Sequence, residues 1–231
     1  MPDSRQMACL DALGIDVYVR RGLAGAVLPP AVAPAIEATL DWEPLCDMVA
    51  SCRRCALHAT RTQAVFGVGS RTAQWMFIGE APGAEEDKRG EPFVGRAGQL
   101  LTSMLRAAGL RREDVYIANM LKCRPPDNRD PKPAEAVACR GYLERQIELV
   151  NPALIVAVGR IAAQHLLATD TPLARLRGRV HTLGSRARPV VVTYHPAYLL
   201  RSPSEKRKAW QDLLFARQTI GRLPRGGGDA S

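Results

Sequence analysis

Four short apolar runs alternate along this chain with longer segments whose apolar residues recur at helical spacing, and this alternation constrains the fold more than any other feature. The runs cover residues 75–78, 115–118, 154–158 and 190–193, and the helical segments cover 98–108, 134–150, 160–167 and 205–220. Strands that alternate with helices are joined by right-handed crossovers into a mainly parallel sheet that is covered on both faces. The pattern therefore predicts an α/β protein.

Polar residues follow three of the four predicted strands. Gly79 to Gly83 come directly after the first strand, Asn119 follows the second, and His195 lies just behind the fourth. The carboxyl ends of parallel strands meet at one edge of the sheet, which is where such sheets bind their ligands. The sequence therefore predicts an active site at this edge.

Four of the six cysteines have a spacing typical of a metal site. Cys52 and Cys55 form a C-x2-C pair, and Cys123 and Cys139 follow further along the chain. A cytoplasmic chain keeps its thiols reduced, which favours metal binding over disulfides. Four thiolates suit either a tetrahedral zinc ion or a [4Fe-4S] cluster, and one C-x2-C pair with two separated cysteines favours the cluster. The alternative is that these are ordinary buried thiols.

The formal net charge of +9 lies almost entirely in the C-terminal part of the chain. From Thr171 onward there are 12 basic and 3 acidic residues, whereas residues 1–70 hold 6 basic and 7 acidic residues. This asymmetry is typical of a nucleic-acid-binding surface, and an arginine-rich soluble surface explains it equally well.

Three parts of the chain differ in composition. Residues 1–40 combine prolines and glycines with alanine and valine, which predicts an N-terminal extension or linker. We expect one globular domain over residues 41–221 and a flexible tail over residues 222–231. No run approaches the roughly 20 apolar residues that span a bilayer, and residues 1–10 lack the apolar core of a signal peptide. We therefore expect a soluble, cytoplasmic protein with no membrane partner.

Four sequence blocks carry a resemblance to a known family. They read GEAPGAEED at 79–87, PFVGRAG at 92–98, KCRPP at 122–126 and HPAYLLR at 195–201. In this order, and together with the four cysteines, they closely resemble the family 4 uracil-DNA glycosylases, which are iron–sulfur enzymes that excise uracil from DNA. The match covers about residues 45–217.

The resemblance implies a fold, a cofactor and a partner. The fold is a three-layer α/β/α sandwich with a central four-stranded parallel sheet. The cofactor is one [4Fe-4S] cluster, and its implied ligands are Cys52, Cys55, Cys123 and Cys139. The implied partner is uracil-containing DNA, single- or double-stranded, and we expect a nucleoid-associated monomer.

Three residues suit the cleavage of an N-glycosidic bond, which places negative charge on the departing base. His195 can donate a hydrogen bond to the uracil O2 as this charge develops, and the resemblance assigns it the same role. Asn119 presents one acceptor and two donors, enough to recognise the O4 and N3 edge of uracil and reject cytosine. Phe93 would stack on the flipped base, as the resemblance implies. Their alternatives are a packing histidine, a turn-forming asparagine and a core aromatic residue.

The turn formed by Gly79, Ala81, Pro82 and Gly83 lets backbone N–H groups approach the substrate closely. The related family 1 enzymes carry a water-activating Asp and a thymine-excluding Tyr in this turn, where Ala81 and Gly83 stand here. Water activation is therefore unassigned, and Glu80 and Glu86 are the candidate catalytic carboxylates. Either could instead be a solvated carboxylate that stabilises the following turn.

A base must leave the duplex before an enzyme can reach it. Tyr198, Leu199 and Leu200 could enter the base stack and hold that gap, although core packing explains the two leucines about as well. Arg96 and Arg201 complete the predicted DNA-binding residues, and Lys206, Arg207 and Lys208 are expected to contact phosphates.

The main rival hypothesis is a non-catalytic iron–sulfur protein that binds nucleic acid or transfers electrons. A phosphate-binding loop at Gly79–Gly83 is weakly supported, because the turn lacks G-x-x-x-x-G-K-[ST]. The segment 124–129 contains no histidine, so we do not expect the covalent DNA adduct of one related branch.

Overall fold

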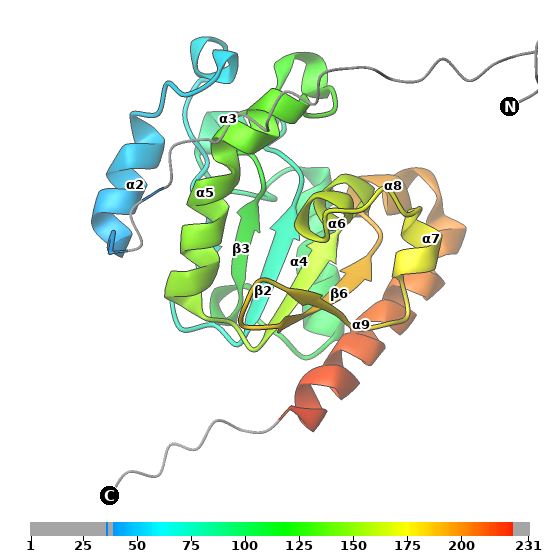
Figure 1. The fold of residues 1–231 in the computed structure, drawn as a ribbon. Coiled ribbons are helices and arrows are strands. Elements are labelled where there is room, and N and C mark those ends of the chain that lie inside the picture. Colours follow the sequence, from blue (N-terminus) through cyan, green and yellow to red (C-terminus); the bar gives the residue numbers. More distant parts are fainter. Residues whose placement is uncertain (1–35, 37–38, 224–231) are drawn as a thin grey trace, which may run out of the picture. The chain divides into compact units, whose positions relative to one another are not determined.

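A computed structural model describes residue 36 and residues 39–223 (Figure 1). The helices are α2 (Trp42–Ala50), α3 (Ala84–Arg89), α4 (Arg96–Ala107), α5 (Pro133–Val150), α6 (Arg160–Leu166), α7 (Leu173–Leu176), α8 (Pro196–Arg201) and α9 (Lys206–Arg222). The strands are β1 (Val68–Gly69), β2 (Trp75–Gly79), β3 (Tyr116–Asn119), β4 (Leu154–Val158), β5 (His181–Leu183) and β6 (Arg188–Thr193). Nearly all of the expected extension over 1–40 and of the expected tail over 222–231 lies outside the described residues.

The four strands and four helices predicted from periodicity are all present, and each of their bounds lies within two residues of the predicted one. The expectation of a four-stranded sheet is wrong, because the sheet has six strands in the order β1-β3-β2-β4-β6-β5. The inner four strands are parallel, and the edge strands β1 and β5 run antiparallel to their neighbours. Each edge strand has only two or three residues, which is too few to show an alternating apolar pattern.

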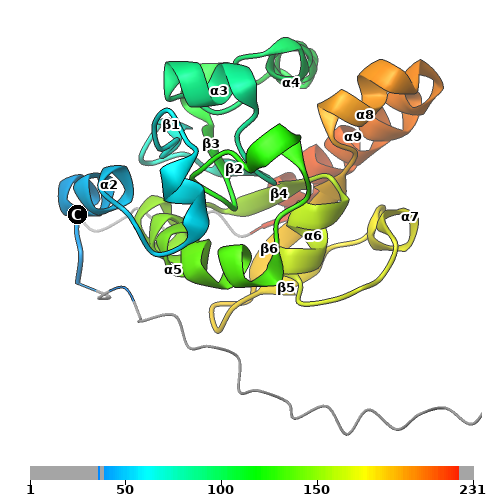
Figure 2. The same ribbon diagram turned by 90° about the horizontal axis from the view of Figure 1, so that it is seen from above.

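Helices cover both faces of the sheet, as Figure 2 shows for α5 and α6 on one side and α4 and α9 on the other. Successive side chains of a strand point to opposite faces, so β2 contributes to two apolar cores. Met76 and Ile78 pack with α2, α5 and α6, whereas Trp75 and Phe77 pack with α4 and α9. All five residues of β2 are buried, which explains why the strand appears as a continuous apolar run.

The parallel register brings the ends of the inner strands together. Gly79 at the end of β2 lies opposite Asn119 at the end of β3, and Val158 of β4 lies opposite Thr193 of β6. His195 caps the first turn of α8 two residues after β6 ends. The three polar segments predicted to share one edge of the sheet therefore do so.

None of the helices in the described part of the chain has the length and apolar character needed to cross a membrane.

Candidate active site

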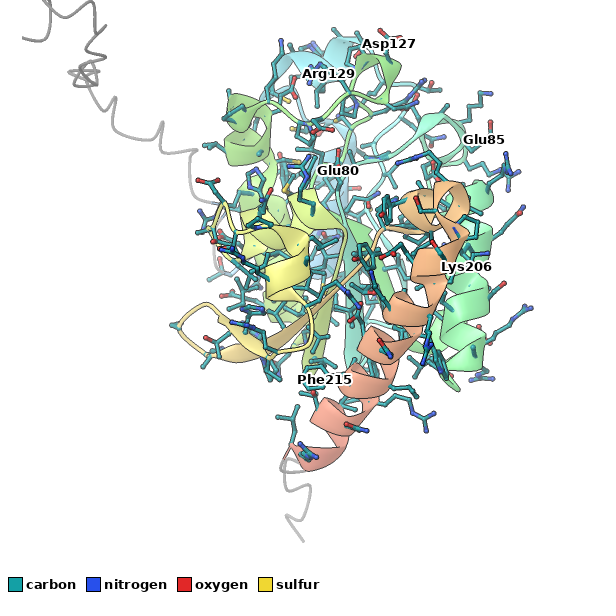
Figure 3. All side chains as sticks on the ribbon, turned by 90° about the vertical axis from the view of Figure 1, so that its right-hand side faces the viewer. Glu80, Glu85, Asp127, Arg129, Lys206 and Phe215 are labelled. Carbon is teal, nitrogen blue, oxygen red and sulfur yellow. The ribbon has the colours of Figure 1, made fainter. Side chains whose placement is uncertain are left out.

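A cavity of about 690 Å3 opens at the edge where the inner strands end. It is lined by the turn after β2, Glu86 of α3, Phe93, Asn119, the loop between Pro125 and Asp130, and the start of α8. Figure 3 shows Glu80 and Arg129 toward this end of the molecule, with Phe215 of α9 toward the other end. A cavity with a few convergent polar groups at such an edge is the usual site of ligand binding in an α/β fold.

Asn119 and Phe93 meet over Gly79 inside this cavity. A Cβ atom on residue 79 would lie 2.5 Å from Oδ1 of Asn119 and 2.6 Å from the Phe93 ring, so only glycine fits. Asn119 is 2% exposed, and its Oδ1 has no hydrogen-bond partner among the described residues. Because a buried acceptor without a partner is unfavourable, this oxygen is suited to accept a hydrogen bond from a bound ligand.

Phe93 is buried in a strained backbone conformation. Its φ of +55° lies in the left-handed region, which residues with a side chain rarely adopt. Strain of this kind is typical of ligand-binding positions and costs on the order of 1–3 kcal/mol. The ring lies 5.6 Å from the imidazole of His195, measured between centroids. The structure thus places the proposed stacking residue beside the proposed hydrogen-bond donor.

The imidazole of His195 has a defined tautomer. The backbone N–H of Ala197 donates to its Nδ1 at 3.1 Å, so in the neutral ring the proton is on Nε2. Burial, together with the nearby positive charge of Arg201, lowers the pKa of His195 to about 4, against a smaller opposing effect of Glu86. At neutral pH this residue is therefore a neutral N–H donor that lines the cavity.

Glu86 uses both carboxylate oxygens to hold the backbone of two turns. Its Oε2 accepts from the N–H of Gly83 at 3.1 Å, and its Oε1 accepts from the N–H groups of Val94 and Gly95 at 2.9 and 3.0 Å. These bonds join the start of α3 to the segment that carries Phe93. The geometry suits a role in positioning the turns better than the activation of a water molecule.

Glu80 has different surroundings. Its side chain lines the cavity and makes no hydrogen bond with any described residue. Burial, followed by the negative charge of Asp130, raises the pKa of Glu80 to about 7, and the positive charge of Arg160 partly opposes this shift. Asp130 and Arg160 form an ion pair of 3.1 Å and line the same cavity. A carboxyl group with a pKa near neutrality suits proton transfer.

The residues predicted to bind DNA belong to α4 and α8, and two of them, Tyr198 and Arg201, line the cavity. Tyr198 and Leu200 are each 37% exposed, Leu199 is 1% exposed, and Arg96 and Arg201 are exposed. Leu199 therefore packs in the interior, whereas its neighbours on α8 face outward.

An aromatic stack supports Tyr198 from behind. Tyr198 stacks on Tyr194 with 5.2 Å between ring centroids, and the guanidinium of Arg177 lies 4.5 Å from the Tyr194 ring. Arg177 is held in turn by a bidentate ion pair with the buried Asp212 at 2.7 and 2.9 Å. This chain of contacts orients the tyrosine at the rim of the cavity.

The four predicted ligand cysteines lie in one region beside α5. Cys123 and Cys139 are buried, and Cys52 and Cys55 pack against the same apolar core. The negative charge of a Cys52 thiolate contributes to the raised pKa of Cys55, of Cys123 and of Cys139, so these thiols lie near Cys52. Within the described residues, however, no group of three or more His, Cys, Asp or Glu side chains is placed to hold a metal ion.

Donors surround these thiols. The Arg61 guanidinium donates to Sγ of Cys123 at 3.0 Å, and the backbone N–H of Lys122 donates to Sγ of Cys139 at 3.3 Å. Burial raises the pKa of Cys139 to about 12 and also raises the pKa of Cys123, while nearby positive charge opposes both shifts. Burial thus disfavours the thiolate forms of Cys123 and Cys139, and a positively charged metal centre would offset this cost.

Sequence analysis missed several residues of this region: Lys122, Asp130, Arg160, Arg177 and Tyr194. Lys122 and Tyr194 are next to predicted site residues, and this adjacency was the available signal. Asp130, Arg160 and Arg177 reach the region from loops and helix starts that show no motif, so the sequence contains no comparable signal for them.

Comparisons with known proteins agree with this site. The model of the uracil DNA glycosylase superfamily matches residues 66–214. The type-4 uracil-DNA glycosylase of Archaeoglobus fulgidus is 48% identical over 181 residues, which are 75% of this chain and 90% of that protein. The type-4 uracil-DNA glycosylase of Thermotoga maritima is 47% identical over 178 residues, 75% of this chain and 92% of that protein. The type-5 uracil-DNA glycosylase of Thermus thermophilus is 37% identical over 117 residues, 44% of this chain and 53% of that protein.

Proposed function

The chain belongs to the uracil DNA glycosylase superfamily and, within it, to the type-4 uracil-DNA glycosylases. On this premise we propose that it flips uracil out of DNA and hydrolyses the N-glycosidic bond, which leaves an abasic site. The observation that carries the proposal is the meeting of three groups in one cavity. These are the unpartnered Oδ1 of Asn119, the ring of Phe93 and the neutral imidazole of His195.

Asn119 selects the base. Its Oδ1 accepts the N3–H of uracil and its amide nitrogen donates to O4, while Phe93 stacks on the ring. Cytosine has no hydrogen on N3 and carries an amino donor at C4, so both hydrogen bonds would be lost. A site that leaves its buried polar groups unpaired rejects the wrong ligand strongly.

His195 stabilises the leaving group. As the glycosidic bond breaks, negative charge develops on the uracil O2, and the Nε2–H of the neutral imidazole donates to it. The bond from Ala197 to Nδ1 keeps this proton on Nε2. Ala81, Pro82 and Gly83 line the same cavity. The backbone N–H of Ala81 assists base binding, because Pro82 has no N–H and the N–H of Gly83 donates to Glu86.

Glu80 activates the attacking water, and Glu86 holds the turn. This division rests on their surroundings, because the Glu80 carboxyl is unbonded and has a pKa of about 7, whereas both oxygens of Glu86 accept backbone hydrogen bonds. As a carboxylate, Glu80 takes a proton from water as the oxygen attacks the sugar.

We further propose that the domain over residues 41–221 acts as a monomer on single- or double-stranded DNA. Tyr198 and Leu200 enter the gap left by the flipped base, and the buried Leu199 anchors them. Arg96, Arg201, Lys206, Arg207 and Lys208 contact phosphates; Lys208 is also paired with Glu205 at 2.9 Å.

We propose that Cys52, Cys55, Cys123 and Cys139 hold a [4Fe-4S] cluster. The donors from Arg61 and Lys122 suit thiolate ligands, and four thiolates that each bind a different iron need not converge on one point, as ligands of a single zinc ion must. When bound, the cluster cross-links the segment before β1, the loop after β3 and α5 through iron–thiolate bonds.

The deciding experiment measures release of uracil from a uracil-containing oligonucleotide, with a thymine-containing oligonucleotide as control. We expect uracil release by the purified wild-type protein, no thymine release, and loss of discrimination or of activity in Asn119→Ala. A folded protein that binds the oligonucleotide but releases no uracil would overturn the proposal and favour a non-catalytic binding protein.

A further inference from the structure

Lys122 is an almost completely buried cation between the uracil-reading residue and the cysteine site. It is 1% exposed, and its ammonium group donates to three oxygens. These are the carbonyl of Asn119 at 2.8 Å, Oε1 of Gln146 at 2.5 Å and the carbonyl of Phe66 at 3.2 Å. A buried ammonium group is strongly unfavourable unless its donors are used, and here each of the three has an acceptor.

The bond to the Asn119 carbonyl holds the end of β3. Immediately after Asn119, the N–H groups of Met120 and Leu121 donate to the carbonyls of Gly79 and Glu80 at 2.9 and 3.0 Å. The backbone that carries the Asn119 amide is therefore held by the turn after β2 on one side and by the Lys122 ammonium on the other.

Lys122 also contacts the cysteine site. Its backbone N–H donates to Sγ of Cys139 at 3.3 Å, and the next residue in the chain is Cys123. A displacement of either cysteine would therefore act on Lys122, and through its ammonium on the Asn119 carbonyl.

We propose that Lys122 is a positioning residue for uracil recognition, whose ammonium holds the main chain of Asn119 so that the amide faces the base, and which joins this position to the cysteine site. The inference rests on the proposed function, because it concerns the efficiency of uracil excision. A merely structural lysine would stabilise the fold without a specific dependence on the Asn119 side chain.

A double-mutant cycle separates these two roles. Lys122→Met keeps the aliphatic length and removes the donors. Gln146→Met is the matched control. It removes one acceptor of the Lys122 ammonium and the bonds from Gln146 to Tyr116 and Phe66, but it does not alter either partner of the bond from Lys122 to Asn119. Single-turnover rates at saturating enzyme are measured for each variant in the wild-type and Asn119→Ala backgrounds, with iron content, melting temperature and DNA affinity measured in parallel.

We expect Lys122→Met to lower the single-turnover rate at least tenfold while DNA affinity changes less than twofold. In the Asn119→Ala background the same substitution should change the rate less than twofold. Gln146→Met should lower the melting temperature but retain the rate within about threefold. If Lys122→Met fails to fold, Lys122→Gln carries the same test, because its amide offers fewer donors for the Asn119 carbonyl and its rate deficit must also disappear in Asn119→Ala.

An equal rate loss in both backgrounds, or a loss in Gln146→Met as large as in Lys122→Met, would overturn the inference. If wild-type protein releases no uracil, the proposed function itself fails. If wild type is active and Lys122→Met is equally active, only the role of Lys122 is refuted.

Discussion

The rate of uracil excision should fall at acidic pH as Glu80 becomes protonated. Substitution of Asp130 and of Arg160 should shift the pH of this fall in opposite directions. Asp130 raises the pKa of the Glu80 carboxyl, whereas Arg160 lowers it. Asp130→Asn removes a negative charge and also releases Arg160 from its ion pair, so both consequences favour ionised Glu80. Arg160→Gln removes the opposing positive charge and favours the protonated form.

The magnitude follows from the pKa of about 7. If only ionised Glu80 activates water, about half of the enzyme is active at pH 7, about 10% at pH 6 and about 1% at pH 5. The rate should therefore fall about tenfold for each pH unit below about pH 6. Burial is the largest cause of the rise in the pKa of Glu80 from 4.5 to about 7. Removing one neighbouring charge should therefore change this pKa by only a fraction of that rise, about half a pH unit.

The assay is single-turnover excision at saturating enzyme between pH 5 and 9, which removes the pH dependence of DNA binding from the rate. Asp130→Asn should move the acid limb, the fall of the rate at low pH, to lower pH and raise the rate at pH 6. Arg160→Gln should move the acid limb to higher pH. Glu80→Gln should lower the rate about 10²- to 10⁴-fold and abolish the limb. The reasoning is refuted if the wild-type rate is flat across this range, or if both neighbouring substitutions shift the limb in the same direction.

Four further predictions concern other parts of the site. His195→Ala should lower the single-turnover rate by about 10²- to 10³-fold with little change in DNA affinity, and an unaltered rate would remove His195 from the mechanism. Gly79→Ala should abolish excision in a folded protein, as judged by circular dichroism, because the added methyl group overlaps the uracil-binding groups; normal activity would contradict this geometry. Lys206→Glu with Arg207→Glu should weaken binding to every DNA sequence and flatten the log–log salt dependence by about 0.9 per lost phosphate contact, and an unchanged slope would count against phosphate contacts there. Purified protein should be brown, and Cys139→Ser should lower its visible absorbance, iron content and melting temperature, whereas a colourless, zinc-containing and fully active protein would exclude the cluster.

The amino-acid sequence predicted the inner part of the fold because that part leaves a local pattern. The continuous apolar run of β2 and the helical spacing in α4 and α5 reflect burial on two faces or on one, and a short window of sequence contains that information. The edge strands β1 and β5 were missed because two or three residues contain no period. The polar residues at the ends of strands followed from topology, since parallel strands must end at one edge.

The tertiary structure decided what each polar residue can do. Glu80 and Glu86 are equivalent as carboxylates in the sequence, yet one is an unbonded group with a raised pKa and the other accepts three backbone hydrogen bonds. Likewise, Leu199 and Leu200 are identical neighbours, but only Leu200 is exposed.

The sequence by itself therefore determined the succession of the inner strands and helices along the chain, the edge that holds the site and the residue types available there. Only the tertiary structure determined the protonation of His195, the free acceptor of Asn119 and the place of Lys122 between Asn119 and the cysteines. The physical reason is that periodicity depends on residues near one another in the chain. Burial, hydrogen bonding and electrostatic interactions depend instead on groups that the chain brings together from distant positions.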